Sequence, residues 1–300
     1  MRCICSRRLL LVPISTKTRQ AIRCACFLDE RGKKQEKANQ ARPSKPRVRK
    51  ELFCGFSCSI PVSVQPENFR RPDLLRLSYD DYRAAPAIAN SDLSRLRDAL
   101  NGRPPRPISA LNALSLGTAF HTALLEPELY TPGQPGINDT LVWWLVDGVK
   151  LNPELNALLQ AGTPEPSCIF TEPTTNTLCK LRADLVVDQP GHPYTIIDFK
   201  TTLARDYNHF LAQCSGYDYD RQAAFYSDAL HADRFLLVGV QKVEPFDVFT
   251  VEVSPPMLTE GRAKYMRLLK LLLPNAEVPS YLTETVREVA NNLGQTPAES

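Results

Sequence analysis

The sharpest constraint on the fold is a change of hydrophobic pattern in the middle of the chain. Three short runs rich in β-branched and apolar residues follow one another, separated by turn-forming stretches: "CIFTE" at 168–172, "KLRADLVV" at 180–187 and "YTIIDFKT" at 194–201. Short apolar runs bounded by such turn residues predict strands rather than helices. We therefore expect this region to form a three-stranded antiparallel meander.

Helical patterns lie on both sides of these strands. Leucines at helical spacing predict a helix from Asn90 or Ser91 to Gly102, and a second helix is expected over 109–125. After the meander, the expected elements are a helical region at 205–231, strands at 234–241 and 246–253, and helices at 255–273 and 280–293. This order predicts one α/β domain with a mixed central sheet flanked by helices.

Basic residues are concentrated at the start of the chain. Residues 1–50 hold 15 of the 36 Lys and Arg residues but only three of the 33 Asp and Glu residues. Residues 31–50 contain no strongly apolar residue except Val48, so this stretch cannot bury enough surface to offset the entropy lost on ordering. We therefore predict a basic N-terminal extension at 1–70 and a folded domain at 71–300, with an organellar transit peptide as the alternative for the first residues.

The nine cysteines follow the same division. Six lie in the first 58 residues, and their C-x-C and C-x-x-x-C spacings leave a zinc-binding arm as an alternative, although the usual C-x-x-C and histidine partners are missing. Cys168, Cys179 and Cys214 are dispersed, which is typical of free thiols in a reducing compartment. We therefore expect a cytoplasmic protein. No run reaches the about 18 apolar residues of a membrane span, so none is expected.

The third strand combines apolar residues with two opposite charges. Side chains alternate faces along a strand, so Asp198 and Lys200 share one face, while Ile197 and Phe199 point the other way. The turn before this strand brings Asp184 toward Asp198 at one end of the sheet. Neighbouring carboxylates repel each other unless a cation lies between them, which predicts a divalent metal.

This arrangement predicts a chemistry. A metal would polarise a phosphoryl oxygen and activate water, while Lys200 would orient the attacking water and stabilise charge growing on the phosphate. The pattern therefore indicates metal-dependent phosphodiester hydrolysis, and an ordinary surface ion pair is the alternative. Further candidates are His121, within the second predicted helix, and the pair Gln222 and Tyr226, which share one helix face at a spacing of four residues.

The order of these residues resembles the RecB-like branch of the PD-(D/E)xK nucleases, in particular the exonuclease VIII (RecE-type) C-terminal nuclease domain. The resemblance covers about residues 77–270, and its main stretches are "LSYDDYRAAPAIANSDLSRLRDA", "LGTAFHTALLEPELY" and "GYDYDRQAAFYSDAL". It implies a restriction-endonuclease-like core. The site residues that it implies are the metal ligands His121, Asp184 and Asp198 for Mg²⁺ or Mn²⁺, the catalytic Lys200, and Gln222 and Tyr226, which contact the substrate or support the site.

The same resemblance implies a deoxyribonuclease, most specifically a 5′-to-3′ exonuclease on duplex DNA that serves recombination. It also implies a single-strand annealing protein as partner and a ring-like homo-oligomer. Glu172 is a secondary candidate, and Arg182 and Thr201 are candidate neighbours of the site. Two alternatives stay open. One is another RecB-like nuclease, an endonuclease or single-strand exonuclease of repair or defence; the other is a DNA-binding module without turnover.

Overall fold

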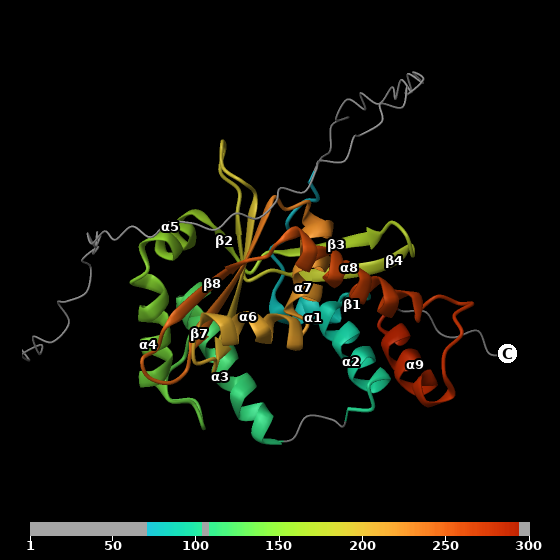
Figure 1. The fold of residues 1–300 in the computed structure, drawn as a ribbon, viewed down its shortest axis with the longest axis horizontal. Helices are drawn as coiled ribbons and strands as arrows, with labels where there is room; N and C mark the ends of the chain where they lie inside the picture. The colour runs from blue at the N-terminus through green and yellow to red at the C-terminus, as the bar shows by residue number, and fades with distance from the viewer. Residues whose placement is uncertain (1–70, 104–107, 294–300) are drawn as a thin grey trace, which may run out of the picture. The chain divides into compact units, whose positions relative to one another are not determined.

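The computed structural model describes residues 71–103 and 108–293 (Figure 1). The predicted basic extension at 1–70, its six cysteines and the zinc alternative lie outside the described residues, and the domain boundary stays a prediction. Within the described part, Cys168, Cys179 and Cys214 are buried free thiols. No helix in the described ranges is long and apolar enough to cross a membrane.

The strands form two sheets. Their bounds are β1 Ile88–Ala89, β2 Thr163–Pro164, β3 Ser167–Glu172, β4 Thr177–Arg182, β5 Leu185–Val187, β6 Thr195–Thr202, β7 Arg234–Gln241 and β8 Val248–Glu252. The larger sheet has the order β2-β5-β6-β7-β8, and the smaller sheet has the order β1-β4-β3. In the larger sheet β6 and β7 are parallel, and the other neighbours are antiparallel. The central sheet is therefore mixed, as predicted.

The predicted strand at 180–187 is two strands in different sheets. β4 pairs with β3 in the smaller sheet, and β5 pairs with β6 in the larger one. Between them, Ala183 N donates to Pro166 O at 3.0 Å, and Asp184 O accepts from Glu165 N at 2.9 Å. The single meander is therefore wrong, because backbone bonds to a distant segment replace the strand pairing at this point.

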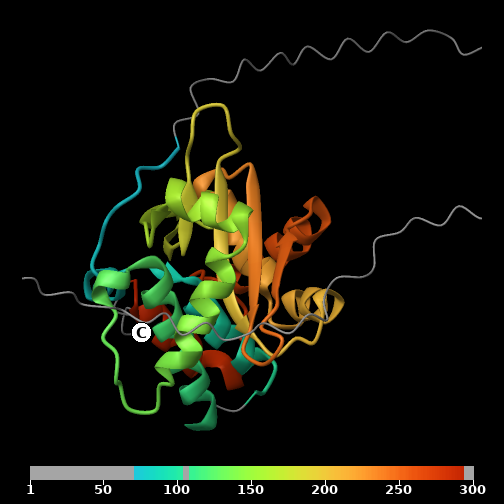
Figure 2. The same cartoon turned by 90° about the vertical axis from the view of Figure 1, so that its left-hand side faces the viewer.

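Helices cover both faces of the larger sheet (Figures 1 and 2). Their bounds are α1 Tyr79–Ala84, α2 Asn90–Leu100, α3 Ile108–Leu125, α4 Asp139–Lys150, α5 Pro153–Ala161, α6 Tyr207–Gly216, α7 Tyr219–Leu230, α8 Pro255–Lys270 and α9 Thr283–Asn291, with short 3₁₀ turns η1 Pro127–Leu129 and η2 Ser280–Leu282. One hydrophobic core lies between the sheet and α3, α4 and α5, and includes Ile197 and Phe199. A second core joins the opposite face to α2, α6, α7, α8 and α9.

Helix α7 is fixed tightly between its neighbours. The predicted helical region at 205–231 divides at Asp218, whose backbone is left-handed (φ 57°, ψ 37°), so α7 starts in a new direction. Helix α8 lies so close to α7 that a Cβ on Gly261 would be 2.0 Å from Asp220 O. This contact requires glycine, and it lets α8 pack closely against α7.

Candidate active site

Asp198 and Lys200 lie side by side on β6, the middle strand of the larger sheet. Lys200 Nζ is 2.5 Å from Asp198 Oδ2, and the Asp198 side chain is only 1% exposed. β6 is paired with β5 on one edge and with β7 on the other, which holds both side chains in place. Because a buried carboxylate is costly unless it is paired, this is not an ordinary surface ion pair.

Helix α7 adds three side chains to this pair. Gln222 Nε2 donates to Asp198 Oδ1 at 2.6 Å. Burial raises the pKa of Tyr226 well above its usual value, and a hydrogen bond with Gln222 opposes that shift. The Tyr219 ring centre is 5.1 Å from Lys200 Nζ, within cation–π range. The structure thus brings Gln222 and Tyr226 to the charged pair. It also adds Tyr219, which its place one turn before Gln222 could have revealed.

A second cluster lies between β4 and β5. Asp184 Oδ2 accepts a hydrogen bond from Phe199 N at 2.7 Å, and His121 Nδ1 of α3 is 3.5 Å from the same oxygen. Glu165, between β2 and β3, completes the cluster: one possible ligand atom each from His121, Glu165 and Asp184 lies within 4.8 Å of the others. The bond to Phe199 N ties this cluster directly to the strand that carries Asp198 and Lys200.

The chemistry of this cluster fits a divalent cation. The two carboxylates are donors that suit Mg²⁺ or Mn²⁺, whereas the imidazole is a softer donor, more typical of transition metals. Asp198 Oδ2 is buried and, among the described residues, receives no hydrogen bond of regular geometry, although Lys200 is close. The cluster differs from the predicted ligand set of His121, Asp184 and Asp198. Glu165 joins it, while the Asp198 oxygens face Lys200 and Gln222.

Glu165 was missed in the sequence because no motif marks it. It lies between Pro164 and Pro166 in a connection, with a φ of 51° that is unusual for a residue other than glycine. Arg182 Nε donates to Glu165 Oε2 at 2.6 Å and holds the carboxylate. Only the separation of β4 from β5 brings Glu165 to Asp184, so no local sequence signal indicated it.

The secondary candidates have other surroundings. The Glu172 carboxylate accepts hydrogen bonds from Thr174 N at 3.1 Å and from Thr175 N at 2.7 Å, in the turn between β3 and β4. Glu172 therefore stabilises a hairpin and does not join the cluster. Thr201 faces α3, where a Cβ on Gly117 would be 3.8 Å from its hydroxyl.

The titrating groups of the site depend on one another. Burial raises the pKa of Asp198 to about 6, with Lys200 opposing the shift and Asp184 adding to it. Burial also acts to raise the pKa of Asp184, but the charge of His121 holds it below its usual range. Burial and the charge of Asp184 raise the pKa of Glu165 to about 7, although Arg182 opposes this. Neighbouring carboxylates repel each other, so Asp184, Asp198 and Glu165 do not all ionise easily. A bound cation would relieve this repulsion.

The family comparison agrees with this geometry. Residues 145–278 match the family model described as a PDDEXK-like domain of unknown function (DUF3799). The fold is that of the PD-(D/E)xK, restriction-endonuclease-like proteins. The match includes Glu165, Asp184, Asp198, Lys200 and α7. It begins at residue 145, so His121 lies outside it. Over the matched residues the chain is therefore similar to the PD-(D/E)xK superfamily of nucleases.

Solved structures add only a general likeness. A predicted exonuclease from Eubacterium rectale is 18% identical over 71% of this chain and 93% of that chain, with a TM-score of 0.48. A phage-related exonuclease from Haemophilus somnus is 14% identical over 61% of this chain and 91% of that chain, with a TM-score of 0.32. Because both TM-scores are below 0.5, neither likeness bears on the activity of this chain. No curated protein matches the sequence.

Proposed function

We propose that this protein is a metal-dependent deoxyribonuclease that hydrolyses phosphodiester bonds. One observation carries the proposal: the buried Asp198 and the partly buried Lys200 lie directly beside the cluster of His121, Glu165 and Asp184. The two groups are joined through Phe199 N, which donates to Asp184. A cluster that can hold a metal, next to a partly buried lysine, is the arrangement that phosphodiester hydrolysis needs.

Each residue has a role in this proposal. His121, Glu165 and Asp184 would hold Mg²⁺ or Mn²⁺, with Asp198 beside them. A metal bound there would polarise a phosphoryl oxygen and lower the pKa of a water molecule. Burial disfavours the charged form of Lys200, but the Asp198 and Asp184 carboxylates hold its pKa above the usual value, so it stays protonated. The ammonium can then stabilise negative charge that develops on the scissile phosphate.

The mode of action is the finer part of the proposal. The order of motifs resembles the exonuclease VIII type, which supports a 5′-to-3′ exonuclease that acts on duplex DNA in recombination. A homo-oligomer, a single-strand annealing partner and a cytoplasmic location complete this proposal. An endonuclease or a single-strand exonuclease of the RecB-like branch uses the same site residues. Substrates that differ in their DNA ends are therefore needed to distinguish these activities.

The test uses the full-length chain with Mg²⁺ and DNA whose ends are blocked selectively. We expect hydrolysis of linear duplex DNA that requires Mg²⁺ and stops when the 5′ ends are blocked, but continues when the 3′ ends are blocked. Unchanged degradation with both 5′ ends blocked would overturn the exonuclease VIII mode. Cleavage of closed circular duplex would instead indicate an endonuclease.

A pair of lysine variants tests the chemistry itself. Lys200→Ala should lower the hydrolysis rate roughly hundredfold or more, because it removes a preorganised charge at the phosphate. Lys150→Ala, at an exposed position on α4, should keep the wild-type rate. Thermal melting should show that both variants are folded. A folded Lys200→Ala variant with the wild-type rate would refute the proposed mechanism.

A further inference from the structure

Two tyrosine rings lead outward from the proposed catalytic lysine. The Tyr219 ring centre is 5.1 Å from Lys200 Nζ, and the Tyr217 ring centre is 5.7 Å from that of Tyr219, with the two rings tilted by 43°. Tyr217 is 58% exposed, whereas Tyr219 is partly buried. The Tyr217 ring therefore presents apolar surface to solvent, and it is connected to Lys200 through the Tyr219 ring.

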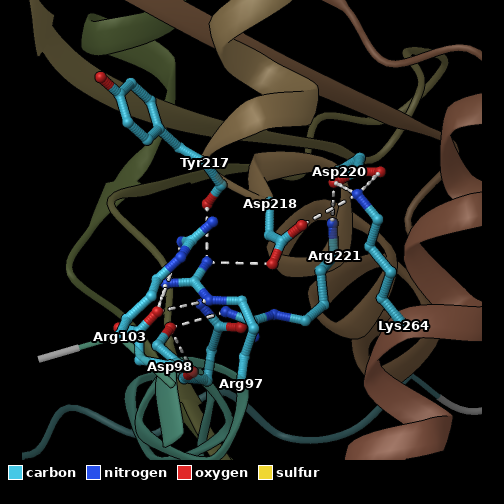
Figure 3. A network of polar contacts seen from close by, with 10 residues as sticks. Arg97, Asp98, Arg103, Tyr217, Asp218, Asp220, Arg221 and Lys264 are labelled. Carbon is cyan, nitrogen blue, oxygen red and sulfur yellow. Dashed lines mark hydrogen bonds and ion pairs between the residues drawn. The ribbon is translucent and has the colours of Figure 1, made fainter. Parts of the chain in front are cut away.

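The backbone that carries Tyr217 is braced by a polar network. Asp218, between the two tyrosines, pairs with Arg97 at 3.0 Å and with Lys264 at 3.0 Å. Lys264 also pairs with the buried Asp220 at 2.8 Å. Figure 3 shows this network and shows the Tyr217 ring directed away from it. The ring is thus presented on a fixed turn, which lowers the entropy lost when a ligand binds.

A ring in this position suits a nucleobase. Every base has a π face, so stacking on an aromatic side chain tolerates any sequence. Successive nucleotides are about 3.4 Å apart along a duplex axis, and the steps from Lys200 to Tyr219 and on to Tyr217 are 5.1 and 5.7 Å. Two such steps cover about three nucleotides at this spacing, so a base on Tyr217 lies within about three nucleotides of the phosphate at Lys200. Inside a duplex both faces of a base are covered, so an open face is found only on a terminal base pair or on an unpaired nucleotide.

One cation of the polar network is available to a DNA strand as the occupant. The network in Figure 3 includes the cationic side chains Arg97, Arg103, Arg221 and Lys264 and the carboxylates Asp98, Asp218 and Asp220. Arg103 is about half exposed, and its pairing with Asp98 is loose at 3.5 Å. Its guanidinium can therefore turn to a backbone phosphate, since arginine is well suited to phosphate.

We propose that Tyr217 is a stacking platform for an unpaired base that lies within about three nucleotides of the scissile phosphate. The platform gives the protein a preference for DNA ends with unpaired nucleotides over fully paired ends. This inference rests on the proposed function, because the position of the base is defined relative to Lys200.

The experiment measures binding separately from cleavage. A duplex with a 5′ overhang carries 2-aminopurine at successive overhang nucleotides, and the full-length chain carries Lys200→Ala so that the strand stays intact. We expect stacking to quench the fluorescence at one position. Adding Tyr217→Ala should remove the quenching and weaken binding of the overhang about tenfold. Tyr217→Phe keeps the ring and should bind like its parent.

Two controls make the result specific. Tyr207→Ala removes another exposed tyrosine, at the start of α6, and should leave overhang binding unchanged. An abasic site at the quenched position should weaken binding by the parent to the same extent as Tyr217→Ala, and should abolish the difference between the two proteins. Such non-additivity would assign the lost affinity to one base on one ring.

The outcomes separate this inference from the proposed function. Equal overhang affinity of Tyr217→Ala and its parent would overturn the platform, even if the wild-type chain hydrolyses DNA. If Tyr217→Ala weakened the binding of blunt and overhanging duplexes equally, the stacked group would be a terminal base pair. That result would overturn the unpaired base as occupant. If the wild-type chain hydrolysed no DNA but overhang binding still required the Tyr217 ring, the nuclease would fail and the platform would stand.

Discussion

Gln222 on α7 donates a hydrogen bond of 2.6 Å to Asp198 on β6, and the other oxygen of the same carboxylate faces Lys200 at 2.5 Å. Asp198 is therefore shared between an amide that orients it and an ammonium that it holds. Gln222 acts on Lys200 through Asp198, although Gln222 and Lys200 belong to different elements. Helix α7 is thus joined to the charged strand through Gln222.

We expect Gln222→Ala to lower the DNA hydrolysis rate by about ten- to hundredfold, as is common for residues that orient a reactive group. Gln222→Glu should lower it further, because a second carboxylate would repel Asp198. Both rates are measured across a range of Mg²⁺ concentrations. Gln160→Ala, at an exposed position on α5, is the matched control. Wild-type rates for both Gln222 variants would show that the bond to Asp198 has no part in the reaction.

The two glutamates near β3 should differ in metal binding. Glu165 belongs to the cluster with His121 and Asp184, so Glu165→Ala should weaken Mn²⁺ binding by at least about tenfold in calorimetric titration. Glu172 holds a turn through backbone hydrogen bonds, so Glu172→Ala should keep the Mn²⁺ affinity and lower the melting temperature. Full Mn²⁺ affinity in Glu165→Ala would exclude Glu165 as a ligand. Neither measurement depends on nuclease activity.

Local patterns in the sequence were enough to predict the charged strand. The alternation of faces places Ile197 and Phe199 in the core and directs Asp198 and Lys200 to the opposite face, where α7 lies. The spacing of Gln222 and Tyr226 predicts one helix face in the same way. These predictions depend only on periodicity within one element, which the sequence expresses directly.

Features that depend on distant segments were not predictable from these patterns. The separation of β4 from β5 is set by backbone bonds of Ala183 and Asp184 to the segment before β3, more than ten residues away. Glu165 reaches the site only through that separation. The left-handed turn at Asp218 is stabilised by Arg97 and Lys264 from other helices. Pairings of this kind follow from the assembled fold rather than from a local pattern.

The contact between α7 and α8 predicts a specific sensitivity to one methyl group. A Cβ on Gly261 would lie 2.0 Å from Asp220 O and 2.9 Å from Ala224 Cβ. Gly261→Ala should therefore push the helices apart and lower the free energy of unfolding by about 1–3 kcal/mol. The measurement is urea unfolding followed by circular dichroism.

Gly216 at the end of α6 is the matched control for this substitution. A Cβ there meets no heavy atom within 4 Å among the described residues, and the backbone conformation is one that alanine can adopt. Gly216→Ala should leave the unfolding free energy unchanged or raise it slightly. Equal stability of both alanine variants would contradict the close packing of α7 on α8.

The ion pairs of Asp218 predict a stability difference that depends on pH. Burial acts to raise the pKa of Asp218, but Lys264 and Arg97 together hold it below the usual value. The stabilisation from the Asp218 charge is therefore present above the pKa of an unfolded Asp, about 4. It is lost as the pH falls through the pKa of Asp218 in the folded protein. Asn also tolerates a left-handed backbone, so Asp218→Asn removes the charge without straining the turn. We expect this variant to be less stable than the wild type by about 1–2 kcal/mol at pH 7, with the gap closing toward pH 3 in denaturant unfolding. A gap that stays constant over this range would show that the Asp218 charge does not stabilise the fold.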